Sequence, residues 1–232
     1  SKMEAFYFKP TDILMNISRF EIKSLHFAYP DAPVKVLNNI HLQLPVKGLV
    51  LVKGISGSGK STLLKICTGS LFPQEGTVSV NGRDNEWSHQ WLKENTSYLN
   101  QFPFIFDGTL QYNVFLEKET DQPTGYPSFM EKILAKKEEG WQSELTHNGK
   151  QLSGGERQLV TLARMMLHPR PVAILDEPTA NLDSNTIEII LPEIVKLSKE
   201  RLVIVASHEK MFDAIADVML NLNWGEQVNV PM

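Results

Sequence analysis

Cysteine is almost absent from this sequence: Cys67 is the single one among 232 residues. One thiol cannot form a disulfide within the chain, so a disulfide-stabilised fold of the secreted kind is excluded and a reducing compartment is favoured. Cys67 falls in a segment that we expect to be helical, where a small core residue is a better interpretation than a reactive thiol.

Long apolar runs and an excess of positive charge are also missing. No run approaches the roughly 18 apolar residues that a membrane-spanning helix needs, and no secretory signal is recognisable. We therefore expect the chain itself to be water-soluble. The formal net charge of −4 gives no general electrostatic argument for nucleic-acid binding, so we predict no nucleic-acid partner.

A glycine-rich turn is the most informative stretch that is present. It comprises Gly54, Ile55, Ser56, Gly57, Ser58, Gly59, Lys60, Ser61 and Thr62. The apolar residues 49–52 before it predict a buried strand, and residues 62–66 predict the start of a helix. In this context the spacing indicates a phosphate-binding loop, because backbone N–H groups can converge on phosphate oxygens where no Cβ intervenes. Lys60 would reach the β- and γ-phosphates, and the Ser61 hydroxyl would bind Mg²⁺.

Antiparallel strands are expected ahead of this loop. Apolar side chains alternate roughly with polar ones over residues 20–27, and residues 36–44 continue as strand after a turn at 29–33. We interpret residues 1–19 as a linker or the remnant of a removed segment. Tyr29 lies in the turn, where packing and stacking on a nucleotide base are equally good interpretations.

The middle of the chain changes from strands to helices. A short strand at 76–80 ends in the Asn81-Gly82 turn, residues 84–95 suggest a short helix, and a strand at 97–101 ends at Gln101. Residues 107–151 lack strand patterning and contain two helical stretches, 112–116 and 129–137. Ser153 is a candidate N-cap for a helix over 157–167.

The last third alternates buried strands with helices. Residues 172–177 form an apolar run that ends in two acids, Asp176 and Glu177, and a helix is expected from Ser184. Acidic residues at the carboxyl end of a parallel strand lie where open α/β sheets bind ligands. Another buried strand, 202–206, leads to His208, and a final strand at 218–222 precedes a polar tail.

Five features therefore follow one another in a fixed order: the phosphate loop, Gln101, residues 152–156, Asp176 with Glu177, and His208. Together they resemble the ATP-binding cassette (ABC) ATPase domain over residues 20–222. Residues 152–156, Leu-Ser-Gly-Gly-Glu, are the most specific element, because other phosphate-loop proteins lack them. The resemblance implies an α/β fold: a P-loop NTPase core with a mixed, mostly parallel sheet, an N-terminal antiparallel β-subdomain, and a helical subdomain inserted at about 102–168. The domain would occupy residues 20–232.

The resemblance also implies a role for each site residue, with ATP and Mg²⁺ as the bound groups. Glu177 would polarise the attacking water, and Lys60, Gln101 and His208 would complete the catalytic set. Ser61, Gln101 and Asp176 would hold Mg²⁺, and Tyr29 would stack on adenine. Residues 54–62 would bind the phosphates. Ser153, Gly154 and Gly155 would complete the site of a second ABC domain, head to tail, in a homo- or heterodimer that forms on ATP binding. Asp183 in the loop 181–183 would cross the dimer interface.

Residues 101–110, Gln-Phe-Pro-Phe-Ile-Phe-Asp-Gly-Thr-Leu, are similar to the exporter branch of the family, in which the membrane and ATPase parts are usually one polypeptide. This implies substrate export at the cytoplasmic face of an inner or plasma membrane, through a membrane domain that is fused in the native protein. Phe104, Phe106 and Leu110 are candidates for contact with that domain, with core packing as the alternative. A separate importer subunit and a soluble ABC ATPase remain the alternative functions.

Three positions depart from the exporter or family pattern: Glu156 stands where exporters usually carry Gln, Leu159 where the family commonly has Arg, and His147 where exporters often have Glu.

Overall fold

The N-terminal strands form a small antiparallel sheet in the order β2-β1-β4. Its members are β1 (Phe20–Phe27), β2 (Leu37–Leu44) and β4 (Glu75–Val80). The computed structural model describes residues 17–30, 34–116, 123–180, 182–223 and 225–228, so residues 1–16 of the predicted linker and 31–33 of the predicted turn lie outside it. Ser24 has a φ of 48°, and the β1–β2 register shifts between Ile22 and Leu25. This bulge explains why the sequence alternates only roughly.

A second sheet has the order β11-β10-β3-β9-β8-β5. Strands β10, β3, β9, β8 and β5 are parallel, and β11 pairs antiparallel with β10, so the predicted mixed, mostly parallel sheet is confirmed. Its strands are β3 (Gly48–Gly54), β5 (Thr96–Leu99), β8 (Val172–Asp176), β9 (Leu202–Ala206), β10 (Val218–Asn223) and β11 (Glu226–Val228).

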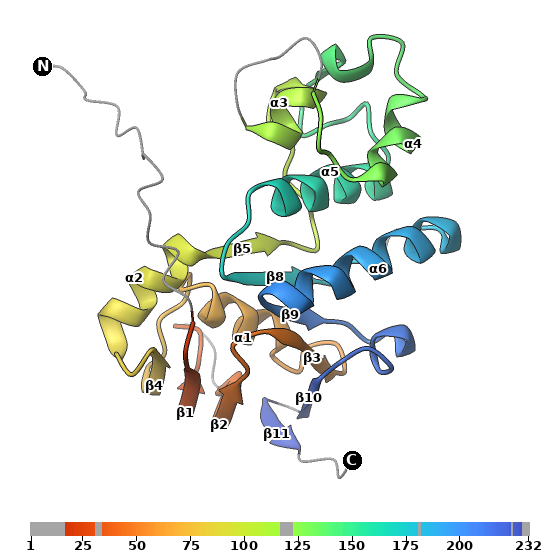
Figure 1. Ribbon diagram of the computed structural model, residues 1–232. Helices are drawn as coiled ribbons and strands as arrows, with labels where there is room; N and C mark the ends of the chain where they lie inside the picture. Colours follow the sequence, from red (N-terminus) through yellow and green to blue (C-terminus); the bar gives the residue numbers. More distant parts are fainter. Residues whose placement is uncertain (1–16, 31–33, 117–122, 181, 224, 229–232) are drawn as a thin grey trace, which may run out of the picture.

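The central strands β3, β8 and β9 are buried on both faces. In β3, Val50 and Val52 belong to one apolar cluster, whereas Leu49 and Leu51 belong to the other. This follows from the two-residue period of a strand. Helix α1 (Lys60–Cys67) packs in the first cluster, between the two sheets, and α5 (Gly154–Leu167) and α6 (Ser184–Glu200) pack in the second, on the opposite face (Figure 1).

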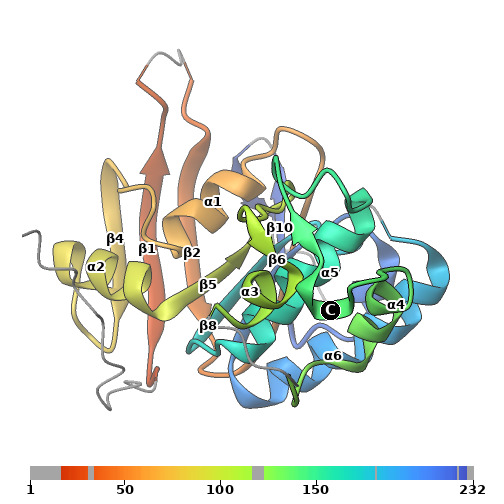
Figure 2. The same cartoon turned by 90° about the horizontal axis from the view of Figure 1, so that it is seen from above.

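The segment between β5 and α5 stands apart from the small sheet and α2 (Asn85–Asn95), as the view from above shows (Figure 2). It contains α3 (Leu110–Phe115), α4 (Glu131–Leu134) and two short 3-10 helices, Ser128–Met130 and Gly140–Gln142. The predicted helix at 129–137 is shorter than expected. The expectation that 107–151 holds no strand is wrong, because β6 (Gly108–Thr109) pairs with β7 (Glu144–Leu145). Two-residue strands are too short to show an alternating pattern.

The polar tail is also more ordered than its composition suggests. Asn221, Leu222 and Asn223 pair with residues of β11, although the sequence predicts only a tail after Leu222. Asn38 Nδ2 donates to Glu226 Oε1 at 3.0 Å, so this hairpin also contacts β2. Residues 229–232 of the tail lie outside the described part of the chain.

Three central strands end at one edge of the sheet. β3 ends at Gly54, β8 ends at Asp176, and β9 ends one residue before Ser207, with the 3-10 helix Lys210–Phe212 beyond. β5 ends at Leu99, two residues short of Gln101. Because parallel strands bring their carboxyl ends together, four chemically important segments converge there. No helix in the described ranges has an apolar stretch long enough to cross a bilayer.

Candidate active site

The phosphate-loop geometry depends on glycine at two positions. A Cβ on Gly54 would lie 2.4 Å from both Leu222 O and Ser58 Oγ, and Gly54 has a φ of 156°. A Cβ on Gly59, whose φ is 94°, would lie 2.9 Å from Val36 O. The loop therefore follows a path close to Leu222 and Val36 that a side chain at Gly54 or Gly59 would block.

The Lys60 side chain of the loop lies in a position that suits an anion, whereas the Ser58 side chain is turned into the protein. Lys60 Nζ donates to Gly54 O at 2.8 Å and to Ile55 O at 3.1 Å, so the ammonium group lies across the loop. Ser58 is buried, and its Oγ has no hydrogen-bond partner within the described part of the chain. Since α1 begins at Lys60 directly after the left-handed Gly59, its first N–H groups also face this loop.

Asp176 lies buried at the end of β8, beside the neighbouring strand β5. Tyr98 Oη donates to Asp176 Oδ2 at 3.2 Å. Burial and the nearby Asp176 carboxylate raise the pKa of Tyr98, so its hydroxyl keeps its proton and can act as the donor. A metal-binding role was predicted for Asp176 but no role for Tyr98, because the contact of Tyr98 depends on the order of the strands.

Glu177 follows Asp176 with an unusual backbone conformation. Its φ is 49°, a left-handed value that is uncommon outside glycine, and its N–H donates to Ala206 O at 2.9 Å. Its Oε1 lies 3.2 Å from His208 Nδ1, whereas its Oε2 is buried without a partner in the described residues. The carboxylate is therefore held on one side and has an unused acceptor on the other.

These groups line one open cavity of about 730 Å³ at the sheet edge. Its lining contains most of the predicted site: Gly54, Ile55, Ser56, Gly57, Gly59, Lys60, Ser61, Thr62, Gln101, Asp176, Glu177 and His208. Val36 and Ala180 also line it and were not predicted. Both are apolar residues in loops, so the sequence offered no chemical signal for them.

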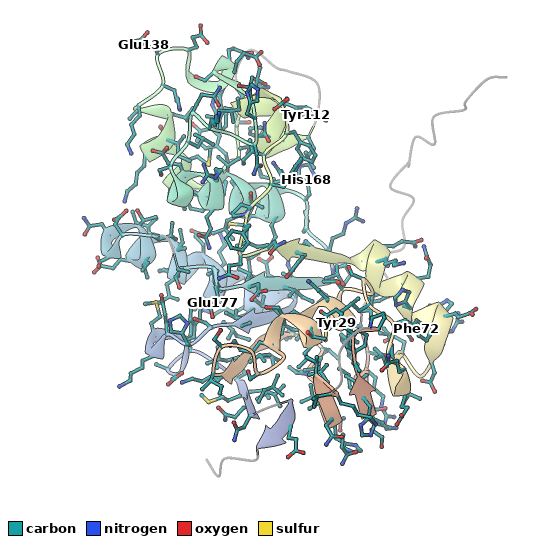
Figure 3. The ribbon with its side chains drawn as sticks, turned by 180° about the vertical axis from the view of Figure 1, so that it is seen from behind. Tyr29, Phe72, Tyr112, Glu138, His168 and Glu177 are labelled. Atoms are coloured by element: carbon teal, nitrogen blue, oxygen red, sulfur yellow. The ribbon has the colours of Figure 1, made fainter. Side chains whose placement is uncertain are left out.

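Tyr29 lies beside the phosphate loop rather than in the lining of this cavity. Its hydroxyl is 3.3 Å from Thr62 Oγ1, and its ring packs edge-on against Phe27 with centroids 5.1 Å apart. The side chain is 38% exposed, so packing does not use its whole surface. Figure 3 shows Tyr29 and Glu177 on different segments of the chain: Tyr29 follows β1 and Glu177 follows β8.

The predicted cross-domain residues do not line this cavity. Ser153 caps α5: its Oγ accepts from Glu156 N at 3.1 Å, and Glu156 Oε2 accepts from Ser153 N at 2.9 Å. Asp183 caps α6 by accepting hydrogen bonds from Thr186, which lower the pKa of the Asp183 carboxyl. Asn181 of the predicted interface loop lies outside the described residues.

The three residues that depart from the exporter or family pattern differ in their contacts and burial. Glu156 completes the capping box, as Gln also would, and its Oε1 bonds to Lys136 Nζ at 2.8 Å. Leu159 is buried in the second cluster. His147 is exposed and its N–H donates to Asp107 Oδ1 at 2.8 Å.

The predicted contact residues after Gln101 divide into two groups. Phe104 and Phe106 are exposed, whereas Leu110 is fully buried and belongs to the core. Arg164 supports the loop: its guanidinium lies 4.7 Å above the Phe106 ring, and its Nη1 donates to Phe104 O at 3.1 Å. Burial lowers the pKa of Arg164 to about 10.

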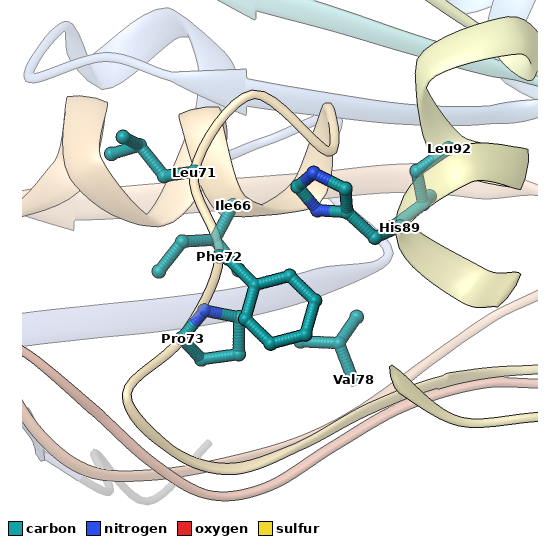
Figure 4. A pocket seen from close by; sticks show the side chains of 7 residues that line it. All are labelled: Ile66, Leu71, Phe72, Pro73, Val78, His89 and Leu92. Atoms are coloured by element: carbon teal, nitrogen blue, oxygen red, sulfur yellow. The ribbon is translucent and has the colours of Figure 1, made fainter. Parts of the chain in front are cut away.

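A second, small pocket does not compete for the role of active site. It is lined by Ile66, Leu71, Phe72, Pro73, Val78, His89 and Leu92 (Figure 4). Its volume of about 10 Å³ is close to that of a single water, and its walls are mainly apolar. A nucleotide cannot fit there.

Comparisons with known proteins agree with the motif order and the fold. The family model described as "ABC transporter" matches residues 37–180. A probable ABC transporter ATP-binding/permease protein of Haemophilus influenzae is 31% identical over 221 residues, which cover 91% of this chain and 39% of the relative. The Bacillus subtilis glutathione/L-cysteine transport system ATP-binding/permease protein CydC is 33% identical over 84% of this chain and 35% of its own length.

A solved structure of a bacterial Atm1-family ABC exporter with ATP bound has the same fold. It superposes with a TM-score of 0.83 at 23% identity and covers 94% of this chain and 39% of that one. The chain thus spans about two fifths or less of the relatives it matches. Because the family model matches more than half of the residues, the chain belongs to the ABC transporter family.

Proposed function

We propose that this chain is the Mg²⁺-dependent ATPase part of an ABC exporter. The observation that carries the proposal is the cavity of about 730 Å³ in which the phosphate loop, Asp176, Glu177 and His208 meet. It brings cationic and N–H groups, which can bind phosphates, together with the Glu177 carboxylate, which can polarise a water molecule, and phosphoryl transfer to water needs both.

The loop residues 54–62 would hold the phosphates of ATP. Lys60 would exchange its carbonyl partners, Gly54 O and Ile55 O, for phosphate oxygens, which are stronger acceptors because they are charged. Tyr29 would contribute its exposed ring to the adenine.

The donor set at the sheet edge fits Mg²⁺. A Ser61 hydroxyl, a Gln101 amide and the Asp176 carboxylate are oxygen ligands of the kind that Mg²⁺ uses together with substrate phosphates. When bound, Mg²⁺ neutralises charge on the phosphates. The Glu177 carboxylate would accept a hydrogen bond from the attacking water, and His208 beside it would steady the γ-phosphate.

Two copies would form the working unit, head to tail. Ser153, Gly154 and Gly155 start the long helix α5 but do not line this chain's own cavity, so the N-terminus of α5 is available to a phosphate of a second domain. Asp183 would lie at the same interface. ATP would favour the closed pair and hydrolysis the open one, as a ligand-driven shift in population.

A membrane domain would be the second partner, which places the ATPase at the cytoplasmic face of a membrane. The exposed rings of Phe104 and Phe106 offer it an apolar contact surface. The relatives described above carry the words "ATP-binding/permease" in their names, which supports a fused arrangement.

The proposal is tested by ATPase rates measured against protein concentration, for the wild type and Glu177→Gln. We expect the ATP hydrolysis rate per wild-type molecule to rise with protein concentration. The Glu177→Gln variant should still bind ATP, but its hydrolysis rate should be at least 100-fold lower. Size-exclusion chromatography of the ATP-bound variant should show a dimer. Normal turnover by Glu177→Gln would contradict the proposed base, and a monomeric ATP-bound variant would contradict the shared site.

A further inference from the structure

Gln158 lies in the second turn of α5 and is only 1% exposed. Its neighbours on the helix, Leu159 and Val160, are core residues. Burying a primary amide among such residues costs free energy unless its polar atoms find partners. Gln158 Nε2 has one: it donates to the backbone carbonyl of Glu177 at 2.9 Å.

The oxygen of the Gln158 amide shows why the contact made by Nε2 matters. Gln158 Oε1 is buried and has no hydrogen-bond partner in the described ranges. A residue retained only to fill this space would be more favourable as an apolar side chain of the same size, since that would leave no acceptor unsatisfied. The bond from Nε2 to Glu177 O is therefore the contact that distinguishes glutamine from an apolar residue here.

That bond acts on a backbone that needs support. Glu177 has a φ of 49°, a conformation that is unfavourable for a non-glycine residue because its Cβ crowds a backbone carbonyl oxygen. The peptide groups are fixed from two sides: Glu177 N donates to Ala206 O on β9, and Gln158 donates to Glu177 O from α5. The direction of the Glu177 side chain follows from this conformation, so a change at Gln158 would redirect the carboxylate.

We infer that Gln158 is a positioning residue for Glu177, and that its amide couples the orientation of the Glu177 carboxylate to the position of helix α5. The inference rests on the proposed function, in which Glu177 is the base and the N-terminus of α5 meets the nucleotide of a second copy. Gln158 lies four residues after Gly154, on the same face of the helix. A displacement of α5 when the second copy binds would thus reach the carboxylate through one hydrogen bond.

The test is the Gln158→Met variant of the full chain, alone and combined with Glu177→Gln. Methionine has nearly the same shape, and it removes both the donor and the unsatisfied acceptor. We expect kcat to fall about tenfold or more, while KM and the affinity for a fluorescent ATP analogue change less than twofold. In the Glu177→Gln background the same substitution should not lower the residual rate further, because the group it positions is already inactive.

Gln111→Met is the matched control. Gln111 is also a buried helical glutamine, and its Oε1 accepts from Gln142 at 3.0 Å, outside the cavity. It should leave kcat unchanged. Gln158→Leu gives the same test if the methionine variant does not fold, and failure of both to fold would assign the side chain to stability and overturn the inference.

The remaining outcomes are separable from failure of the proposed function. An unchanged kcat in Gln158→Met would overturn the positioning role, as would equal fold-losses in the wild-type and Glu177→Gln backgrounds. If Glu177→Gln itself turned over normally, the proposed base would fail, and the positioning role would fall with it. Thermal unfolding of each variant identifies a loss of rate that comes from a loss of folded protein.

Discussion

His208 Nδ1 lies 3.2 Å from Glu177 Oε1, which joins an exposed side chain to a buried one. The side chain of His208 is 71% exposed, whereas that of Glu177 is only 12% exposed. The contact therefore fixes the carboxylate from the open side of the cavity. An exposed imidazole can also turn toward a phosphate at little cost, since few packing contacts hold it.

His208→Ala should lower kcat by about 100-fold or more, because the γ-phosphate loses a donor and Glu177 loses a positioning contact. ATP affinity should change much less, since the phosphate loop is untouched. Single-turnover ATPase assays and equilibrium binding measure the two quantities separately. His147→Ala is the control, as His147 is exposed outside the cavity. Equal rates for the two variants would contradict the role of His208.

Lys60→Ala should weaken ATP binding at least tenfold. The substitution removes the charge in the loop and also the bonds to Gly54 O and Ile55 O that brace it. Titration calorimetry with ATP and Mg²⁺ measures the change. Lys53→Ala is matched in charge and position: Lys53 lies on β3 but pairs with Asp213 at 2.8 Å, outside the cavity lining. Unchanged binding by the Lys60 variant would refute its contact with phosphate.

Tyr29→Ala should reduce nucleotide affinity by about 5- to 150-fold, the effect of losing about 1–3 kcal/mol of base stacking. Tyr29→Phe keeps the ring and loses only the 3.3 Å contact with Thr62 Oγ1, so it should bind almost normally. Binding of ATP and of inorganic triphosphate to both variants separates the base from the phosphates. A triphosphate affinity that falls as much as the ATP affinity would show that Tyr29 acts by packing.

Local features of this chain were predictable because they depend on neighbouring residues. Ser153 is the N-cap of α5, as predicted, and Asn81 and Gly82 form a turn with φ values of 54° and 74°. The glycines at 54, 57 and 59 likewise predicted a loop whose backbone a phosphate group could approach closely, because this prediction depends only on adjacent residues. Each of these signals lies within a few residues of the structure it specifies.

Contacts between elements were not predictable, because the strand order decides them. Tyr98 meets Asp176 only because β5 and β8 are neighbours, and Gln158 meets Glu177 only because α5 packs over the end of β8. The pairing of β11 escaped prediction since its residues include Glu226 and Gln227, which give a polar edge strand no apolar alternation. The sequence shows that Tyr98 and Gln158 are present, but it does not show that they contact Asp176 and Glu177.

Tyr98→Phe tests whether such a contact matters for Mg²⁺. The hydroxyl donates to Asp176 Oδ2, so its loss should leave the carboxylate less well oriented and raise the half-saturating Mg²⁺ concentration several-fold, with ATP affinity in the absence of metal unchanged. Mn²⁺ binding in the presence of ATP, followed by electron paramagnetic resonance, measures the metal site without relying on turnover. Tyr126→Phe removes a comparable hydroxyl, which donates to Glu131 Oε1 at 2.7 Å away from the cavity, and should leave Mn²⁺ binding unchanged. If both variants bind Mn²⁺ as the wild type does, Tyr98 does not orient Asp176 for metal.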